Sequence, residues 1–115
     1  MPKILLAEDD ATMVALLKTL LGMEGYQVST LLDQTGDLLD TIRREMPDVL
    51  LLDIFLGETN GLDLLRQLRK TGDLQGLKIV MTSGIDKSAE CLSAGADAFL
   101  LKPYMPEELI ETLRH

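Results

Sequence analysis

The feature that most constrains the fold is a set of four short apolar runs, each continuous rather than alternating with polar residues. Strands that are covered on both faces have this pattern. The runs are residues 4–7, 49–52, 79–81 and 98–101, and a weaker fifth candidate is 26–32. Segments with helical spacing fill the intervals, at about 11–23, 35–45, 60–70, 87–94 and 106–114. The predicted order is therefore strand then helix, repeated five times.

Residues that typically begin or end helices support these intervals. Asn60 and Gly61 open one helix, Pro106 opens another, and Pro47 ends the second. Strands that alternate with helices of this length predict an α/β fold, in which a mainly parallel sheet lies between two helical layers. No linker, repeat or low-complexity tract divides the chain, so we expect one domain over residues 1–115.

Composition excludes several classes of function. The formal net charge of -8 would repel nucleic acid and anionic lipid, so we expect no direct nucleic acid binding and no membrane association. Cys91 is the only cysteine, which rules out an intramolecular disulfide and a thiolate metal site. The N-terminal residues lack the pattern of a signal peptide, and no apolar stretch is long enough to span a bilayer. These features predict a cytoplasmic protein.

The reactive side chains gather at the ends of the predicted strands. In doubly wound sheets, ligands bind outside the carboxyl ends of the strands. The first strand is followed by Glu8, Asp9 and Asp10, the third by Asp53, the fourth by Thr82 and Ser83, and the fifth by Lys102. The topology therefore predicts that all of these side chains lie at one edge of the sheet.

The carboxylates at this edge predict a cation site. Asp10 is best explained as a cap on the helix that starts near residue 11. Glu8, Asp9 and Asp53, by contrast, are expected to crowd together and to repel one another by roughly 4 kcal/mol per pair at an effective dielectric near 20. A divalent cation would relieve this repulsion, and an all-oxygen site favours Mg²⁺ or Mn²⁺.

Asp53, Lys102 and Ser83 together suggest phosphoryl chemistry. Each is weak alone, since Asp53 could be a turn residue, Lys102 a solvated charge and Ser83 a helix cap. A carboxylate beside a cation and a lysine can, however, attack phosphorus as a nucleophile. Lys102 precedes Pro103, where a cis peptide bond is predicted to aim the ammonium back at the acids. Phe99 is either a core residue or an aromatic switch that follows movement of Ser83.

These residues resemble the response-regulator receiver family over essentially the whole chain. The resemblance rests on KILLAEDD at 3–10, PDVLLLDIFL at 47–56 with Gly61 beyond it, KIVMTSG at 78–84 and GADAFLLKP at 95–103. It implies a flavodoxin-like (βα)5 fold with a five-stranded parallel sheet in the order 2-1-3-4-5.

The resemblance also implies an acceptor and a metal site. Asp53 would accept a phosphoryl group from the phosphohistidine of a histidine kinase or phosphotransfer protein. Mg²⁺ would be held by Asp9, Asp53 and the backbone carbonyl of Phe55, with Glu8 acting through water. Lys102 would contact the phosphoryl group.

By the same resemblance, Ser83 is the hydroxyl of the switch and Phe99 the aromatic ring that follows it. The fourth helix, fifth strand and fifth helix would carry the signal to a downstream protein or output domain. The chain would act as a switch rather than as a turnover enzyme, and as a monomer or weak dimer.

Two residues and the length of one interval depart from the family pattern. Gly57 stands where the family usually has proline, which we expect to loosen the loop over the metal site. The interval from Ser83 to Lys102 is about three residues short, so the fourth helix should be short or displaced. Phe55 is bulky beside the acceptor and predicts a longer-lived phosphoaspartate.

Three other functions share parts of this pattern. A phosphatase resembling the haloacid dehalogenases would need a second aspartate two positions after Asp53, where Phe55 stands. A flavin-binding protein would need a phosphate-binding loop rich in Ser, Thr or Gly after the first strand, where this chain has acids. The stronger alternative is a receiver that no longer uses phosphate and acts as a protein-interaction module.

Overall fold

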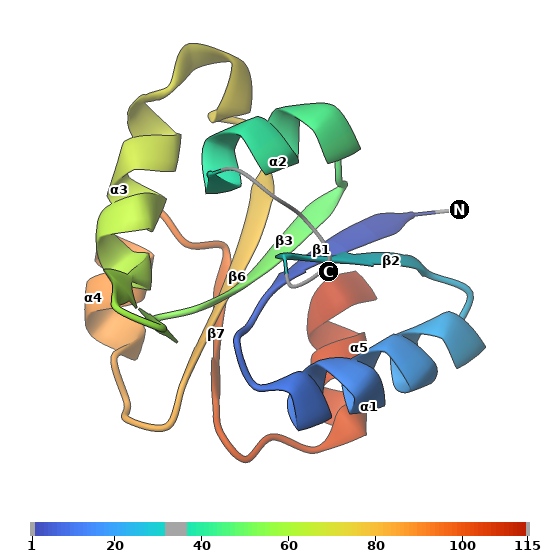
Figure 1. The fold of residues 1–115 in the computed structure, drawn as a ribbon. Coiled ribbons are helices and arrows are strands. Elements are labelled where there is room, and N and C mark those ends of the chain that lie inside the picture. The colour runs from blue at the N-terminus through green and yellow to red at the C-terminus, as the bar shows by residue number, and fades with distance from the viewer. Residues whose placement is uncertain (1, 32–36, 115) are drawn as a thin grey trace.

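The computed structural model describes residues 2–31 and 37–114, which form one five-stranded parallel sheet with helices on both faces (Figure 1). The strands are β1 (Lys3–Ala7), β2 (Gln27–Thr30), β3 (Val49–Asp53), β6 (Lys78–Ser83) and β7 (Ala98–Leu101). Their order is β2-β1-β3-β6-β7. This is the predicted order 2-1-3-4-5 and confirms the flavodoxin-like α/β fold, because the labels β4 and β5 belong to a separate short hairpin.

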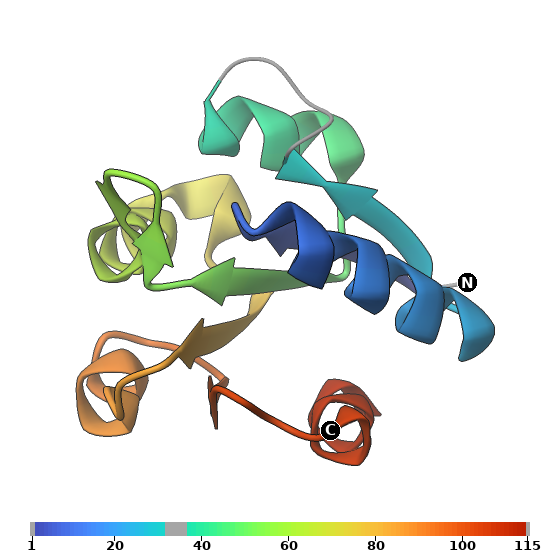
Figure 2. The same ribbon diagram turned by 60° about the horizontal axis from the view of Figure 1, so that its bottom comes forward.

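The hairpin consists of β4 (Phe55–Leu56) and β5 (Thr59–Asn60), which pair antiparallel directly after the central strand β3. Gly57 lies in its two-residue loop with a φ of 57°. Glycine adopts this left-handed conformation without a steric penalty. The hairpin leads straight into α3 (Figure 2).

The helices cover the two faces of the sheet, as predicted. Their bounds are α1 (Ala11–Met23), α2 (Leu38–Glu45), α3 (Gly61–Lys70), α4 (Ser88–Ser93) and α5 (Pro106–Arg114), with a 3-10 turn η2 (Gly72–Leu74) after α3. Helices α1 and α5 pack on one face, and α2, α3 and α4 pack on the other (Figure 1). Alternate residues of the central strands face the two layers: Leu50 and Leu52 contact one, and Val49 and Leu51 the other.

Element boundaries differ from the sequence predictions by a few residues. Strand β2 is shorter than the predicted 26–32, and α2 begins at Leu38 rather than at 35. The parts of those predictions at positions 32 and 35–36 lie outside the described residues. Asp10 caps α1 as expected, since its carboxylate accepts the backbone N–H groups of Thr12 and Met13. Helix α4 spans only six residues, which confirms the prediction of a short fourth helix.

The C-terminal end of α3 is tied to two loops by one side chain. Arg69 donates to the backbone carbonyls of Gly95 (2.8 Å), Gln75 (2.9 Å) and Leu77 (2.6 Å), and to the carboxylate of Asp97 (3.0 Å). Its side chain is largely buried. A single guanidinium therefore joins α3 to the loop after η2 and to the loop between α4 and β7.

Replacing Arg69 with leucine should lower the free energy of unfolding by about 2 kcal/mol, because the partly buried carbonyls of Gly95 and Leu77 lose a charged donor. Urea denaturation would measure the loss. Arg66→Leu, on the same helix, is the matched control. Its ion pair with Asp63 is exposed, and its removal should cost less than about 1 kcal/mol. Equal losses in the two variants would contradict a structural role for the Arg69 contacts.

None of the helices in the described part of the chain has the length and apolar character needed to cross a bilayer.

Candidate functional site

The acceptor candidate Asp53 ends β3 at the carboxyl edge of the sheet, beside Glu8, which follows β1. Both side chains are buried, and each residue is only 6% exposed. The Oδ2 atom of Asp53 and the Oε2 atom of Glu8 each lie 2.6 Å from the Nζ atom of Lys102. The Oδ1 atom of Asp53 accepts the backbone N–H of Phe55 at 3.0 Å. The structure therefore brings together three of the side chains that the sequence assigned to this edge.

Lys102 reaches the acids from the end of β7. Its backbone N–H donates to the carbonyl of Ser83 at 2.8 Å, which continues the pairing of β7 with β6. The Lys102–Pro103 peptide bond is cis, as predicted. Burial acts to lower the pKa of Lys102, but the hydrogen bonds to Asp53 and Glu8 outweigh it and raise the pKa above the ordinary 10.5. The ammonium is therefore charged at neutral pH.

The pKa of Glu8 is also raised, but mainly by burial rather than by hydrogen bonds. Burial raises its pKa above the ordinary value, and the neighbouring Asp53 carboxylate acts in the same direction. The hydrogen bonds from Lys102 and from the backbone N–H of Asp10 oppose this rise without cancelling it. Burial therefore destabilises the charged form of Glu8, and Lys102 partly offsets this cost.

Asp9 does not join the other two acids, and this corrects the expectation that three carboxylates crowd together. The Oδ2 atom of Asp9 accepts the backbone N–H of Gly57 at 2.7 Å, whereas Glu8 and Asp53 both bind Lys102. Within residues 2–31 and 37–114, no three acidic, histidine or cysteine side chains are close enough to hold a metal ion. Lys102 supplies a positive charge to both buried acids in this arrangement.

Gly57 also behaves differently from the sequence expectation of a loosened loop. Its N–H ties the β4–β5 hairpin to the residue after β1, across 48 positions of sequence. A proline has no N–H and could not make this bond. No sequence signal identifies this contact, because every residue except proline carries the same donor.

The donor types at this edge nevertheless fit Mg²⁺. Asp9, Asp53 and the carbonyl of Phe55 are all oxygen donors, and Mg²⁺ binds oxygen ligands through one or two carboxylates while keeping several waters. Asp9 is exposed, and within the described residues its Oδ1 atom has no protein donor. These residues would hold the ion, with Glu8 acting through water.

Ser83 and Phe99 occupy the positions expected of a switch pair but make ordinary structural contacts here. Ser83 ends β6, is fully buried, and its hydroxyl accepts the backbone N–H of Ile85 at 3.1 Å. Phe99 is partly buried and packs on the cluster beneath α3 and α4. In this arrangement Ser83 acts as a turn residue and Phe99 as a core residue.

Comparison with known proteins decides the family. The family model of the response regulator receiver domain matches residues 4–114. The chain is a response regulator receiver domain. It is 36% identical over 113 residues to response regulator MprA of Mycobacterium avium, which covers 97% of the chain and 49% of that protein. The probable transcriptional regulator ycf27 of Guillardia theta is 32% identical over 112 residues, covering 97% of the chain and 44% of that protein.

A solved structure agrees with this assignment. The BeF3-activated N-terminal receiver domain of Klebsiella pneumoniae RstA superposes with a TM-score of 0.84 at 35% identity, covering 97% of this chain and 95% of that one. The chain spans about half the length of the curated relatives it matches. As a receiver domain of a two-component system, it belongs to a family that interacts with kinases and output domains and is generally dependent on Mg²⁺.

Two further residues shape the acceptor site of this receiver domain. Gly61, the first residue of α3, packs against the backbone of Asp53 and Ile54, and its N–H donates to the Ile54 carbonyl at 2.6 Å. A side chain there would collide with these backbone atoms. Tyr104 was not singled out from the sequence. Burial beside the site raises its pKa to about 12, so it stays protonated and neutral near the acids.

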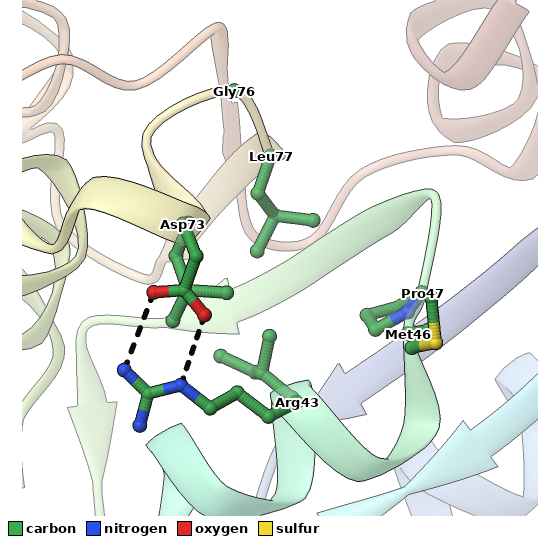
Figure 3. A pocket seen from close by; sticks show the side chains of 8 residues that line it. Arg43, Met46, Pro47, Asp73, Gly76 and Leu77 are labelled. Carbon is green, nitrogen blue, oxygen red and sulfur yellow. Dashed lines mark hydrogen bonds and ion pairs between the residues drawn. The ribbon is translucent and has the colours of Figure 1, made fainter.

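The receiver domain also has a pocket of about 450 Å³ at the opposite edge of the sheet, between α2 and η2 (Figure 3). Ile42, Leu74 and Leu77 contribute apolar surface to the pocket. Arg43 forms a bidentate ion pair with Asp73, in which its Nε and Nη2 atoms lie 3.1 and 3.3 Å from the two carboxylate oxygens. None of the candidate site residues lines this pocket. The ion pair of Arg43 with Asp73 joins α2 to η2.

Proposed function

We propose that this receiver domain accepts a phosphoryl group on Asp53 from the phosphohistidine of a kinase or phosphotransfer protein. The observation that carries the proposal is the ion pair between the buried Asp53 carboxylate and Lys102, at 2.6 Å, at the carboxyl edge of the sheet. A carboxylate that is buried beside a fixed cation is oriented for attack and has a positive group ready for the incoming phosphoryl oxygens.

The proposed transfer needs few groups. One carboxylate oxygen of Asp53 attacks phosphorus, a P–O bond forms, the P–N bond to histidine breaks, and the electron pair returns to the imidazole nitrogen. Lys102 shifts from the carboxylates toward a phosphoryl oxygen. The Phe55 N–H holds Oδ1 of Asp53 in place. Mg²⁺, when bound, offsets the charge that the phosphoryl group brings to the acids.

The proposed output follows from Ser83. Its hydroxyl would donate to a phosphoryl oxygen, drawing the loop from Gly84 to Lys87 inward, and the ring of Phe99 would move into the vacated space. The affected surface would be that of α4, β7 and α5, which carries exposed Leu92 and Leu101. The chain would thus work as a switch that signals to a downstream protein or output domain, rather than as a turnover enzyme.

Intact mass measurement after incubation with acetyl phosphate and Mg²⁺ tests the acceptor directly. We expect the wild-type chain to gain one phosphoryl group and Asp53→Ala to gain none. A gain in both proteins would place the acceptor at another residue. No gain in either would favour the phosphate-independent interaction module.

The exposed ring of Phe55 should slow hydrolysis of the phosphoaspartate. It is 53% exposed and lies two residues after the acceptor, where it would obstruct an approaching water molecule. Phe55→Asn should therefore shorten the lifetime of the phosphorylated form severalfold, measured by the decay of the phosphorylated mass after removal of the donor. Leu16→Asn, which alters an equally exposed apolar residue on α1, is the control. An unchanged lifetime in Phe55→Asn would contradict the shielding role.

A further inference from the structure

The contact between Gly57 and Asp9 links two separate parts of the proposed metal site. Asp9 follows β1, and Gly57 lies in the loop of the β4–β5 hairpin, whose first residue is Phe55. The Gly57 N–H donates to Oδ2 of Asp9 at 2.7 Å. The hydrogen bond therefore joins a carboxylate and a backbone segment that are both proposed to supply oxygen ligands.

The hydrogen bond from Gly57 restricts the orientation of the Asp9 carboxylate. The residue is exposed, and within the described part of the chain neither a lysine nor an arginine pairs with it. An exposed carboxylate without such a contact would rotate freely. Because Oδ2 is held by Gly57, the plane of the carboxylate is set and Oδ1 remains for another partner.

The hairpin depends on the same residue. Gly57 has a φ of 57°, a conformation that a proline cannot adopt and that most other residues adopt only with strain. Phe55 pairs with Asn60 and Leu56 with Thr59 on either side of it. The glycine thus satisfies two requirements at once: a left-handed backbone that closes the hairpin, and an N–H that points at Asp9.

We propose that the backbone N–H of Gly57 is a positioning group for divalent cation binding, which holds the Asp9 carboxylate and the Phe55 segment in register. The inference rests on the proposed Mg²⁺-dependent function and deepens it. Hydrogen bonds to ligating carboxylates set their orientation, and losing one typically weakens metal binding by about 10-fold or more. A proline at this position would lack the N–H and could not make the contact.

Three substitutions at position 57 change the N–H and the backbone conformation to different degrees. Gly57→Asn keeps the N–H and tolerates the left-handed conformation better than other side chains. Gly57→Ala keeps the N–H but disfavours that conformation, and Gly57→Pro removes the N–H and cannot adopt the conformation at all. The asparagine and alanine variants therefore report the effect of the conformation alone, and the comparison of Asp9→Ala with wild type tests the hydrogen bond without changing position 57.

Calorimetric titration of the 115-residue chain with MgCl2 should show wild type and Gly57→Asn binding alike and Gly57→Pro binding about tenfold more weakly than Gly57→Ala. Urea denaturation of each variant confirms that it is folded. The amide NMR spectrum of Asp9→Ala should show the Gly57 N–H signal shifted from its position in the wild-type spectrum. This comparison tests the contact even if the proline variant fails to fold.

Equal affinities in the alanine and proline variants, or an unmoved Gly57 signal in Asp9→Ala, would overturn the positioning role while leaving the Mg²⁺ site intact. A wild-type chain that binds no Mg²⁺ would instead reject the metal-dependent function, and the positioning role with it. The two failures are thus distinguishable in the same titration series.

Discussion

Lys102→Met should lose both phosphorylation and stability. In the proposed function Lys102 meets the incoming phosphoryl oxygens, and removing such a group from a site typically slows the reaction by roughly 10²- to 10³-fold. It also leaves Glu8 and Asp53 as two buried carboxylates without their counter-charge. Breaking a buried ion pair on one side costs about 3 kcal/mol or more. We therefore expect a loss of about 3 kcal/mol at neutral pH.

The loss should depend on pH in a defined direction. In the wild type the pKa of Lys102 is raised, so the stability that its charge contributes is present below pH 10.5 and is lost only as the pH rises through the folded-state value. The pKa of Glu8 is already raised, so its ionisation costs stability as the pH rises above 4.5, and this cost should grow without the lysine. The gap between wild type and Lys102→Met should therefore narrow as the pH falls toward 4.5.

Urea denaturation at several pH values, with phosphorylation followed by intact mass, would measure both effects. Lys70→Met is the control, because Lys70 lies exposed at the end of α3 and pairs with neither Glu8 nor Asp53. It should change neither quantity appreciably. A gap in stability that stays constant between neutral pH and pH 4.5 would show that lost packing, not unpaired charge, explains the effect of Lys102→Met.

Gly61→Ala is expected to disturb the acceptor through the backbone alone. A Cβ atom at this position would lie 2.8 Å from Cα of Ile54 and 3.0 Å from the carbonyl carbon of Asp53. These are backbone atoms of β3 and the turn after it, which cannot move aside as a flexible side chain could. Overpacking of this kind costs about 3 kcal/mol, and relief requires Asp53 to shift, so phosphorylation should fall together with stability.

Gly22→Ala is the matched control for that prediction. Gly22 lies in α1, is exposed, and a Cβ atom there would meet nothing within 4 Å. Alanine in a helix is more stable than glycine, so this variant should gain roughly 0.5–1 kcal/mol and phosphorylate normally. Denaturation and intact mass would compare the two variants. A Gly61→Ala chain that matches wild type in both would mean that the turn after β3 relaxes freely.

Much of this molecule could be predicted from local patterns. Continuous apolar runs marked four strands, because a strand buried on both faces has apolar residues at every position. Helical spacing marked five helices, because a helix buried on one face repeats its apolar residues about every 3.6 positions. Asp10 was correctly identified as a helix cap, since capping is a contact between near neighbours. The edge at which the acids lie also followed, because the carboxyl ends of parallel strands meet at one edge. The order of the strands was implied by the resemblance to the receiver family rather than by local patterns.

Tertiary structure alone decided how the charged groups pair at that edge. Lys102 binds Glu8 from 94 positions away and Asp53 from 49, and the sequence did not indicate that it would take both acids and leave Asp9 apart. Asp9 instead binds a backbone N–H, a donor that nearly every residue carries and that no sequence pattern distinguishes. Periodicity and capping are properties of neighbouring residues and can be read locally. Which of several like charges meets a given cation depends on distances set by the packed sheet, and these exist only once the chain has folded.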